Sequence, residues 1–458
     1  MPQDTIYALS TPYGKSGIAI IKISGPQSLR VLQNLNFKKK LTERKATLGK
    51  IYNKNLDLID QVIMIYFAKN NSYTGEDILE LQSHGGIAII NAIFHELSSL
   101  EYLRLANNGE FSRIALENNK ITLNQAEALI ELINAETEYQ RKTAIRNYNG
   151  DLETHYLYWR NTIIELLATA EAYIDFPDDL LSNNQLQVLN KQIQDLRDKL
   201  QKSINLFNNT NQLMTGINIC IAGPTNVGKS TLMNTLSQTN TSIISNIKGT
   251  TRDVVKTKLE ILGIPVILHD TAGLRTTLDK IENIGIKKAK NTIKDSNVLI
   301  LMLEATQIDD LSIITELSQY VDDDIRALVL INKIDLVQNS KHLQNLIETS
   351  LKQMSFKYQK VLLLSLKDRQ HQQNIIHSVQ ELIQNIAPIS SASLVTNRRH
   401  QEKLQLCSQY LNNAIVTKVL ELKSQELRCA AKELGIILGD ISTEEILDQV
   451  FKNFCIGK

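Results

Sequence analysis

The chain has 458 residues, enough for about two to four domains of ordinary size. Hydrophobic residues make up 43% and charged residues 22%, as in ordinary folded globular proteins. Lys and Arg total 50 against 49 for Asp and Glu, so the net charge of +1 gives no global reason to bind nucleic acid, and such binding would need a local patch.

No apolar run approaches the roughly 18 residues that span a bilayer, and the first residues resemble no targeting leader. We therefore expect a cytoplasmic protein without a membrane segment. The four cysteines lack the close spacing of a zinc site, and a disulfide framework is not expected in that compartment; they are Cys220, Cys407, Cys429 and Cys455.

The N-terminal block, residues 1–118, predicts an α+β domain. Short apolar runs with turn residues between them predict strands over 5–10, 17–23, 45–53, 61–68 and 77–81, with helices over 27–35 and from 87 onward. The polar segment Tyr73-Thr-Gly-Glu-Asp77 lies between two of these strands. Its pattern alone fits a plain turn as well as it fits a functional segment.

Residues 119–214 and 387–458 predict long helices that flank a compact central unit. Apolar stripes at three- and four-residue steps favour packing in a helical core over a coiled-coil partner surface. The first helical block is expected to stop at residues 208–211, and one face after Pro388 is expected to hold Leu404, Leu411, Ile415, Val419 and Leu422. Helices on both sides indicate one all-α domain interrupted by an insertion at residues 215–386.

The central unit contains the most specific motif, Gly223-Pro-Thr-Asn-Val-Gly-Lys-Ser230, between an apolar strand and a helix. This context is that of a phosphate-binding loop, whose glycines let backbone N–H groups converge on an anion. Lys229 is expected to reach the β- and γ-phosphates, and Ser230 to contact Mg²⁺. Apolar strands that alternate with helices predict a mostly parallel sheet with nucleotide at its carboxyl ends. His269, in one of these strands, is expected to be a packed core residue.

Four further motifs follow along the chain. In Gly249-Thr-Thr-Arg-Asp253, Thr251 is expected to complete the Mg²⁺ shell, and Asp270-Thr-Ala-Gly273 would contact Mg²⁺ through water and the γ-phosphate. In Asn332-Lys-Ile-Asp335, the Asp335 carboxylate would accept from guanine N1–H and N2–H₂, which adenine lacks, so GTP is expected. Ser365-Leu-Lys367 stands where GTPases usually carry Ser-Ala-Lys, and Leu366 departs from that pattern.

Leu274 occupies the position where a Ras-like site carries its water-orienting glutamine. Leucine cannot orient water, and a site without an added cation hydrolyses GTP at about 10⁻⁴ per second. The spacing leaves the compensating group open among Arg252, Arg275, Asp279 and Glu282.

With these motifs in place, the chain resembles the MnmE (TrmE) family of tRNA-modification GTPases over its whole length. Besides the motifs above, the likeness includes Asp175-Phe-Pro177 and the final Cys455-Ile-Gly-Lys458. The resemblance implies a tetrahydrofolate-binding N-terminal domain (1–118), a helical domain in two parts (119–214 and 387–458), and a Ras-like P-loop GTPase domain (215–386) inserted within it.

The resemblance also implies site residues. Potassium would be held by Asn226, Ser245, Ile247 and Thr250, and Mg²⁺ by Ser230 and Thr251. Glu282 would position the attacking water, and Cys455 would take part in tRNA modification, although its position alone fits a flexible tail that carries a thiol. A 5-formyl- or methylene-tetrahydrofolate would contact Lys22, Glu80, Lys120 and Lys458; the family has Arg at the first position. Nucleotide contacts would come from Asn226, Val227, Gly228, Lys229, Ser230, Thr231, Ser245, Asn246, Ile247, Lys248, Gly249, Thr250, Thr251, Asp270, Thr271, Ala272, Gly273, Asn332, Lys333, Asp335, Ser365, Leu366 and Lys367.

The implied function is GTP-driven modification of tRNA. A homodimer would join the flavoprotein MnmG in a heterotetramer and install an aminomethyl or carboxymethylaminomethyl group on the wobble uridine, with the GTPase domains dimerising during the cycle. The alternative is a ribosome-assembly GTPase of the Era type, which requires an RNA-binding module that the sequence after Ile386 does not show. An iron-transport GTPase would require membrane spans.

Overall fold

The computed structural model describes residues 4–175, 183–238, 243–247, 255–270, 292–307, 325–337, 345, 347–349, 358–389, 395–440, 444–452 and 454–457. The chain forms two compact units. The first contains residues 1–133, 145–190 and 413–458, and the second contains 134–144 and 191–412. The division of the chain at residues 118, 214 and 386 stays a prediction.

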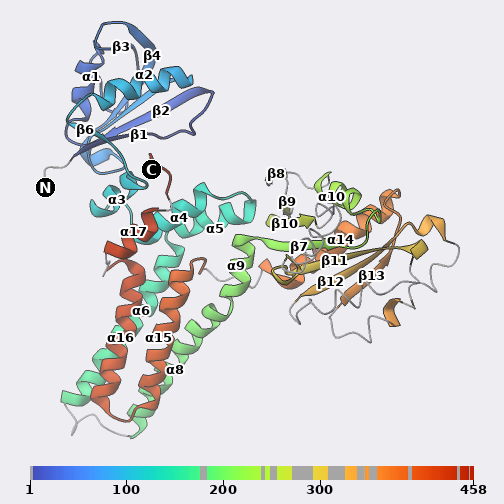
Figure 1. Cartoon of the computed structure of the whole chain (residues 1–458). Coiled ribbons are helices and arrows are strands. Elements are labelled where there is room, and N and C mark those ends of the chain that lie inside the picture. Colours follow the sequence, from blue (N-terminus) through green and yellow to red (C-terminus); the bar gives the residue numbers. More distant parts are fainter. Residues whose placement is uncertain are drawn as a thin grey trace, which may run out of the picture. The chain divides into compact units, whose positions relative to one another are not determined.

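The first unit contains a six-stranded sheet with the order β3-β4-β5-β2-β1-β6 (Figure 1). Its strands are β1 (Thr5–Leu9), β2 (Ser16–Ser24), β3 (Thr47–Tyr52), β4 (Leu58–Phe67), β5 (Ile78–Gly85) and β6 (Leu103–Leu105). Neighbouring strands are antiparallel except β1 and β6. The α+β prediction is confirmed. The short β6 was not predicted, and the helix expected over 27–35 is a 3₁₀ turn (Ser28–Arg30) followed by the single turn α1 (Val31–Asn34).

The two faces of this sheet differ. One face carries the core, in which Ile21, Met64 and Leu81 pack against Ile93 and Leu97 of α2 (Ile87–Ser98). The other, here called the outer face, is covered beside β1 by α3 (Glu110–Glu117), whose Phe111 packs on Ile6 and Ala8. Alternation along β2 therefore places Lys22 on the outer face.

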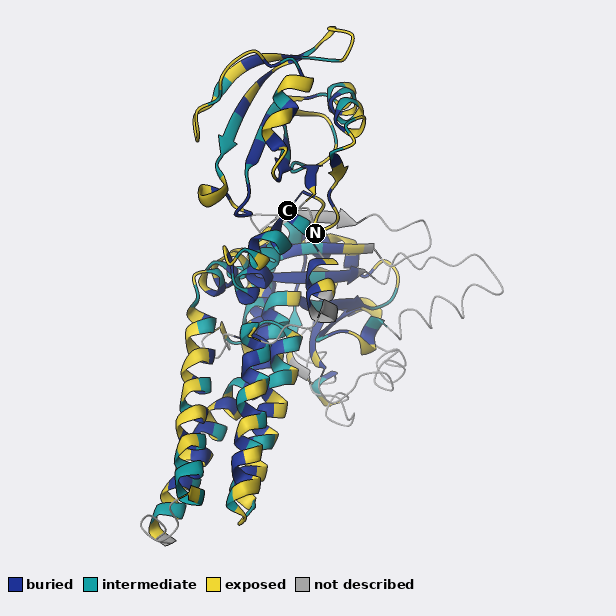
Figure 2. Ribbon diagram, turned by 90° about the vertical axis from the view of Figure 1, so that its left-hand side faces the viewer, coloured by how far each residue is buried: buried dark blue, intermediate teal, exposed yellow. Residues whose placement is uncertain are grey.

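The helices of the first unit bury the apolar stripes that the sequence predicts. They are α4 (Leu123–Ile133), α6 (Asp151–Asp175), α16 (Leu420–Leu438) and α17 (Glu444–Lys452), with α5 (Glu138–Tyr148) crossing into the second unit. The helices α6 and α16 pack along each other, and both have buried residues, such as Ile163 and Leu427. Figure 2 shows buried and exposed residues alternating along the long helices. Residues Val419 and Leu422, which we expected on one buried face, are 49% and 55% exposed, because the chain leaves the helix at 417–419 before α16 begins.

Helices α8 (Asn183–Asn205), α9 (Phe207–Thr215) and α15 (Arg398–Val416) lead into and out of the second sheet. The expected stop at residues 208–211 is wrong: α9 continues through them because Phe207, Thr210 and Leu213 are buried and override the weak helix propensity of the asparagines. Asn209 Nδ2 donates to the Pro388 carbonyl at 3.1 Å, so the segments before and after the central sheet lie side by side, as an insertion requires.

The second unit contains a seven-stranded sheet with the order β13-β12-β11-β7-β10-β9-β8 (Figure 1). The strands are β7 (Ile217–Ala222), β8 (Ile243–Ile247), β9 (Val255–Ile261), β10 (Ile264–Asp270), β11 (Val298–Glu304), β12 (Arg326–Asn332) and β13 (Tyr358–Leu363). All pairs are parallel except those that involve β9, and apolar clusters cover both faces, as predicted. Helices α10 (Lys229–Gln238) and α14 (Arg369–Ile386) pack on one face.

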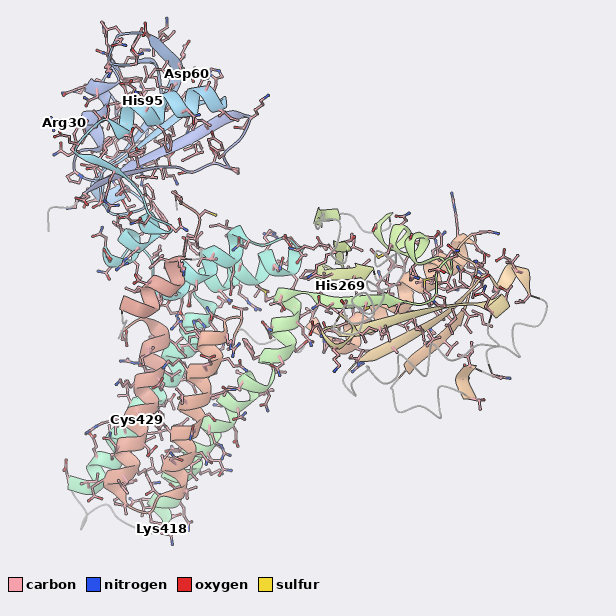
Figure 3. The ribbon with its side chains drawn as sticks, in the orientation of Figure 1. Arg30, Asp60, His95, His269, Lys418 and Cys429 are labelled. Atoms are coloured by element: carbon pink, nitrogen blue, oxygen red, sulfur yellow. The ribbon has the colours of Figure 1, made fainter. Side chains whose placement is uncertain are left out.

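His269, labelled in Figure 3, is 8% exposed, and its Nε2 lies 2.9 Å from Asn218 Oδ1. Burial lowers the pKa of this imidazole, so the prediction of a packed core histidine is confirmed. Across the described ranges, no helix is both long and apolar enough to cross a bilayer. The four cysteines are free thiols, and only Cys455 is exposed.

Candidate functional site

The phosphate-binding loop joins β7 to α10 at the carboxyl ends of the parallel strands. Gly223 and Gly228 have φ of +147° and +107°, and Asn226 is left-handed at +63°. A Cβ on Gly223 would lie 2.1 Å from the Met302 carbonyl oxygen, and one on Gly228 would lie 2.6 Å from Asn332 Nδ2. Only glycine fits these two positions, so the loop is pressed against the ends of β11 and β12.

Lys229 lies inside this loop. Its side chain is buried, and Nζ donates to the carbonyl oxygen of Gly223 at 2.7 Å and to that of Pro224. Asn226, Ser230 and Thr231 are exposed at the rim. The ammonium is therefore held over the loop backbone at the start of α10, and a cation in a glycine loop at a helix N-terminus suits the binding of a polyphosphate.

Asn332 connects three segments of the site. Its Nδ2 donates to the Val227 carbonyl at 2.8 Å, and its Oδ1 accepts from the Leu366 N–H at 3.1 Å. The side chain is 4% exposed, so these hydrogen bonds form away from water and fix the phosphate loop relative to the 365–367 loop.

Asp335 carries the carboxylate that we expect to bind guanine. The Asp335 side chain is 36% exposed, and Lys367 Nζ lies 3.1 Å from its Oδ2. Hydrogen bonds from Ser365, then from Lys367, hold the pKa of the Asp335 carboxyl below its usual value. Asp335 is therefore an ionised acceptor at neutral pH, as recognition of guanine N1–H and N2–H₂ requires.

Leu366, the departure from Ser-Ala-Lys, has a packing explanation. Its side chain is buried in the cluster that contains Val227 and Ile375, and one methyl carbon would lie 3.2 Å from a Cβ on Gly228. Only its backbone N–H faces the site, through Asn332. The larger side chain therefore fills the space beneath the loop and leaves the backbone contact intact.

The structure describes only some of the other predicted site residues. Ser245, Asn246 and Ile247 belong to β8, and Asp270 is the last residue of β10. The remaining ones lie outside the described residues; they are Lys248, Gly249, Thr250, Thr251, Arg252, Thr271, Ala272, Gly273, Leu274, Arg275, Asp279, Glu282 and Lys458.

The structure adds one pair that the sequence analysis missed. Lys333 Nζ lies 2.7 Å from an oxygen of Glu304, the residue that ends β11. The only signal in the sequence was a carboxylate directly after an apolar strand.

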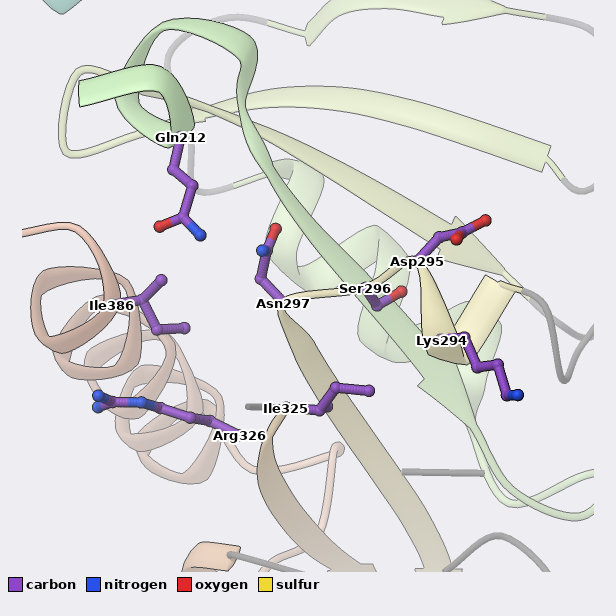
Figure 4. Close-up of a pocket in the computed structure, with 8 residues that line it drawn as sticks. All are labelled: Gln212, Lys294, Asp295, Ser296, Asn297, Ile325, Arg326 and Ile386. Atoms are coloured by element: carbon purple, nitrogen blue, oxygen red, sulfur yellow. The ribbon is translucent and has the colours of Figure 1, made fainter. Parts of the chain in front are cut away.

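A separate cavity lies at the amino ends of the strands of the same sheet. It has a volume of about 470 Å³ and lies beside the first residues of β11 and β12, between Gln212 of α9 and Ile386 of α14 (Figure 4). Because nucleotides bind at the carboxyl ends of such strands, this cavity is not the candidate nucleotide site.

Three of the four expected folate residues lie around the outer face of the N-terminal sheet. Lys22 and Glu80 are register partners on β2 and β5, with Nζ and Oε1 4.0 Å apart and both side chains about one-fifth exposed, at 24% and 20%. Lys120 Nζ donates to the Asn70 carbonyl at 3.0 Å, and its Cε would lie 3.1 Å from a Cβ on Gly75.

The segment Tyr73-Thr-Gly-Glu-Asp77 is more than a plain turn. Glu76 is 4% exposed, and one of its oxygens accepts from Ser24 Oγ at 3.0 Å, while Ser24 Oγ lies 2.8 Å from Thr74 Oγ1. Burial raises the pKa of the Glu76 carboxyl. A buried carboxyl in a hydroxyl network fixes the conformation of this segment beside Lys120.

The C-terminal segment docks at the end of β1. Ile456 forms an antiparallel bridge with Asn108, and Ser10 Oγ donates to the Gly457 carbonyl at 3.1 Å. A Cβ on Gly457 would lie 2.3 Å from the Leu9 carbonyl oxygen, so this glycine permits the close approach. The exposed thiol of Cys455 is therefore held on the N-terminal sheet rather than on a free tail.

The sheet order, the glycine loop at the strand ends and the Asn332–Asp335 motif define a P-loop protein of the GTPase class. Two family models match the chain: "GTP-binding protein TrmE N-terminus" over residues 5–120 and "MnmE helical domain" over residues 123–455. Proteins named "tRNA modification GTPase MnmE" from Rickettsia typhi and Rickettsia prowazekii are each 38% identical over 457 residues, covering 99% of this chain and 100% of each relative. The chain belongs to the MnmE family of tRNA modification GTPases.

Solved structures of Era align with part of the chain. Aquifex aeolicus Era bound to GDP and AlF4⁻ aligns with 48% of this chain and 89% of its own, at 21% identity and a TM-score of 0.30. Era in complex with MgGDPNP and a segment of 16S ribosomal RNA aligns with 52% of this chain and 98% of its own, at 20% identity and the same TM-score, 0.30. Likeness at this level carries no conclusion about function.

Proposed function

We propose that this chain is a cytoplasmic, potassium-activated GTPase that acts with the flavoprotein MnmG to install an aminomethyl or carboxymethylaminomethyl group at C5 of the wobble uridine of certain tRNAs. The match to MnmE relatives along the full chain is the observation that carries this proposal. GTP hydrolysis supplies a conformational cycle through dimerisation of the GTPase domains. The Era-type alternative is disfavoured because residues 5–120 match the TrmE N-terminus.

The residues around the phosphate loop fit the two cations. Asn226 is exposed in a left-handed conformation at the loop rim, and Ser230 presents its hydroxyl in the first turn of α10. Oxygen donors of this kind suit hard cations. Asn226, with Ser245, Ile247 and Thr250, would hold potassium, which supplies positive charge of the kind that an arginine finger provides in other GTPases. Ser230 and Thr251 would hold Mg²⁺, and Glu282 would orient the attacking water in place of Leu274.

GTP turnover is expected to be at least about tenfold faster in potassium than in sodium. An added positive charge is worth about 10³-fold or more in such sites, and a site whose size and ligands suit the larger potassium ion would hold sodium less well. Asn226→Ala should abolish this difference. Asn234→Ala, an exposed asparagine farther along α10, is the matched control and should keep it. Steady-state phosphate release in matched salts measures both, and equal wild-type rates in the two salts would contradict potassium activation.

The outer face of the N-terminal sheet supports the proposed folate site and homodimer. A cavity of about 370 Å³ there is lined by three apolar side chains, Ile18, Leu48 and Ile63, which are 58%, 49% and 37% exposed, and by polar residues that include Gln61 and Gln82. An apolar sheet face of this kind is typical of an interaction surface. Lys22 and Glu80 stand on the same face, so a second copy seated there would enclose a tetrahydrofolate that these residues, Lys120 and Lys458 contact.

The dimer proposal predicts a particle of twice the 51.7 kDa chain mass in solution. Ile18→Asp should convert it to a monomer, because a carboxylate would be buried without a partner. Leu56→Asp, at a residue that is 66% exposed outside this cavity, should leave the dimer intact. Sedimentation equilibrium at micromolar concentration measures the mass, and a wild-type monomer would refute the dimer.

A further inference from the structure

An ion pair joins the ends of two neighbouring strands beside the candidate nucleotide site. Glu304 ends β11 and is the register partner of Asn332, the last residue of β12. Lys333 Nζ lies 2.7 Å from Glu304 Oε2, and Thr306 Oγ1 donates to Oε1 at 2.7 Å. Both carboxylate oxygens are thus engaged, and the Glu304 side chain is only 11% exposed.

The surroundings keep the Glu304 carboxyl ionised. The hydrogen bond from Lys333, then that from Thr306, holds the pKa of the Glu304 carboxyl below its usual value. A charge-assisted hydrogen bond at low exposure is stronger and more directional than one at an open surface. Glu304 therefore fixes the position of the Lys333 ammonium and does not merely lie near it.

Lys333 is constrained at both ends of its side chain. Its backbone has φ of +65°, in the left-handed region that a lysine rarely adopts. It lies between Asn332, which braces the phosphate loop, and Asp335, the expected guanine acceptor. A free lysine side chain would lose rotamer entropy when ligand binding orders it, and the contacts with Glu304 order this side chain before the ligand arrives.

We propose that Glu304 and Thr306 position Lys333 so that its four-carbon stem forms one wall of the guanine pocket. Glu304 is then a positioning residue, which strengthens nucleotide binding through Lys333 without contacting the nucleotide. The inference rests on the proposed assignment of Asn332–Asp335 as the guanine-binding motif. It adds a residue outside that motif which sets nucleotide affinity.

The test is the affinity and dissociation rate of a fluorescent GDP analogue, measured on the full chain. Glu304→Gln keeps the size of the side chain but removes its charge, and should weaken binding about tenfold, mainly through faster dissociation. Glu304→Asp should retain more affinity than Glu304→Gln because the charge remains. The kcat at saturating GTP should stay within about twofold of wild type, since the pair acts on binding and not on the transition state.

A double-mutant cycle separates positioning from a general structural role. Lys333→Met should weaken GDP binding by a similar factor, and the variant with both changes should bind no more weakly than either single variant. Glu381→Gln removes the carboxylate of the exposed Lys360–Glu381 pair and should bind GDP as wild type does.

Two outcomes would overturn the inference: GDP binding by Glu304→Gln that equals or exceeds that of wild type, or losses that multiply in the double variant. A wild-type chain that binds ADP as tightly as GDP would instead refute the guanine site itself.

Discussion

Replacing Lys229 with alanine is expected to lower GTP turnover by at least about 10³-fold. The structure holds the Lys229 ammonium inside the phosphate loop, on the carbonyl oxygens of Gly223 and Pro224. Loss of a single preorganised donor at a developing charge costs about 10² to 10³ in rate, and here the donor also carries a full positive charge. Steady-state phosphate release measures the effect.

The matched control for this change is Lys360→Ala. Lys360 belongs to the same sheet, but its side chain is 49% exposed and its carboxylate partner is 3.8 Å away. Removal of such a surface pair changes stability by less than about 1 kcal/mol and should not affect turnover. Turnover by Lys229→Ala within tenfold of wild type would show that this loop is not the phosphate site.

Replacing Cys455 with serine is expected to stop tRNA modification and leave GTP hydrolysis unchanged. The backbone around Cys455 is fixed by the Ile456–Asn108 bridge and the hydrogen bond from Ser10, while its thiol stays exposed. A hydroxyl fits the same position but is a far weaker nucleophile at neutral pH than a thiol, so modification should fall to below about one-hundredth of wild type.

Cys429→Ser is the matched control for the thiol. Cys429 belongs to α16 of the same compact unit, is half-buried and lies 3.8 Å from Gln425 Nε2 (Figure 3). Its replacement should leave both activities unchanged. Full wobble modification by the Cys455→Ser variant, read by mass spectrometry of tRNA nucleosides, would exclude a chemical role for the terminal thiol.

The sequence predicts the parts of the site that are continuous in the chain. The phosphate loop and the Asn332–Asp335 motif are recognisable because each set of contacts comes from consecutive residues at fixed spacing. The sheet around them follows from near-continuous apolar runs, which indicate strands buried on both faces.

Contacts that depend on how neighbouring strands align could not be predicted from the sequence. The Glu304–Lys333 pair exists because β11 and β12 are in register, and Lys22 meets Glu80 because β2 and β5 are. A shift of either pairing by one residue would separate these side chains, and no local pattern reveals the register. The packing of Leu366 against Gly228 could not be predicted from the sequence either, because it depends on the folded loop.

Helix ends were misjudged where tertiary packing outweighs local propensity. The asparagines within residues 208–211 predict the end of a helix, but Phe207 and Leu213 are buried and α9 continues between them. Val419 and Leu422 continue an apolar period, but the helix has already ended at Val416. Apolar periodicity therefore identified the helices more reliably than it located their ends.

The central claim is that GTP hydrolysis by this chain serves modification of the wobble uridine. Nucleoside mass spectrometry of tRNA from cells that lack the chain tests it most directly, with complementation by wild type and by Lys229→Ala. The account predicts that the C5-modified wobble uridine disappears, returns with the wild-type chain and stays absent with Lys229→Ala. Undiminished C5 modification in the cells that lack the chain would contradict it.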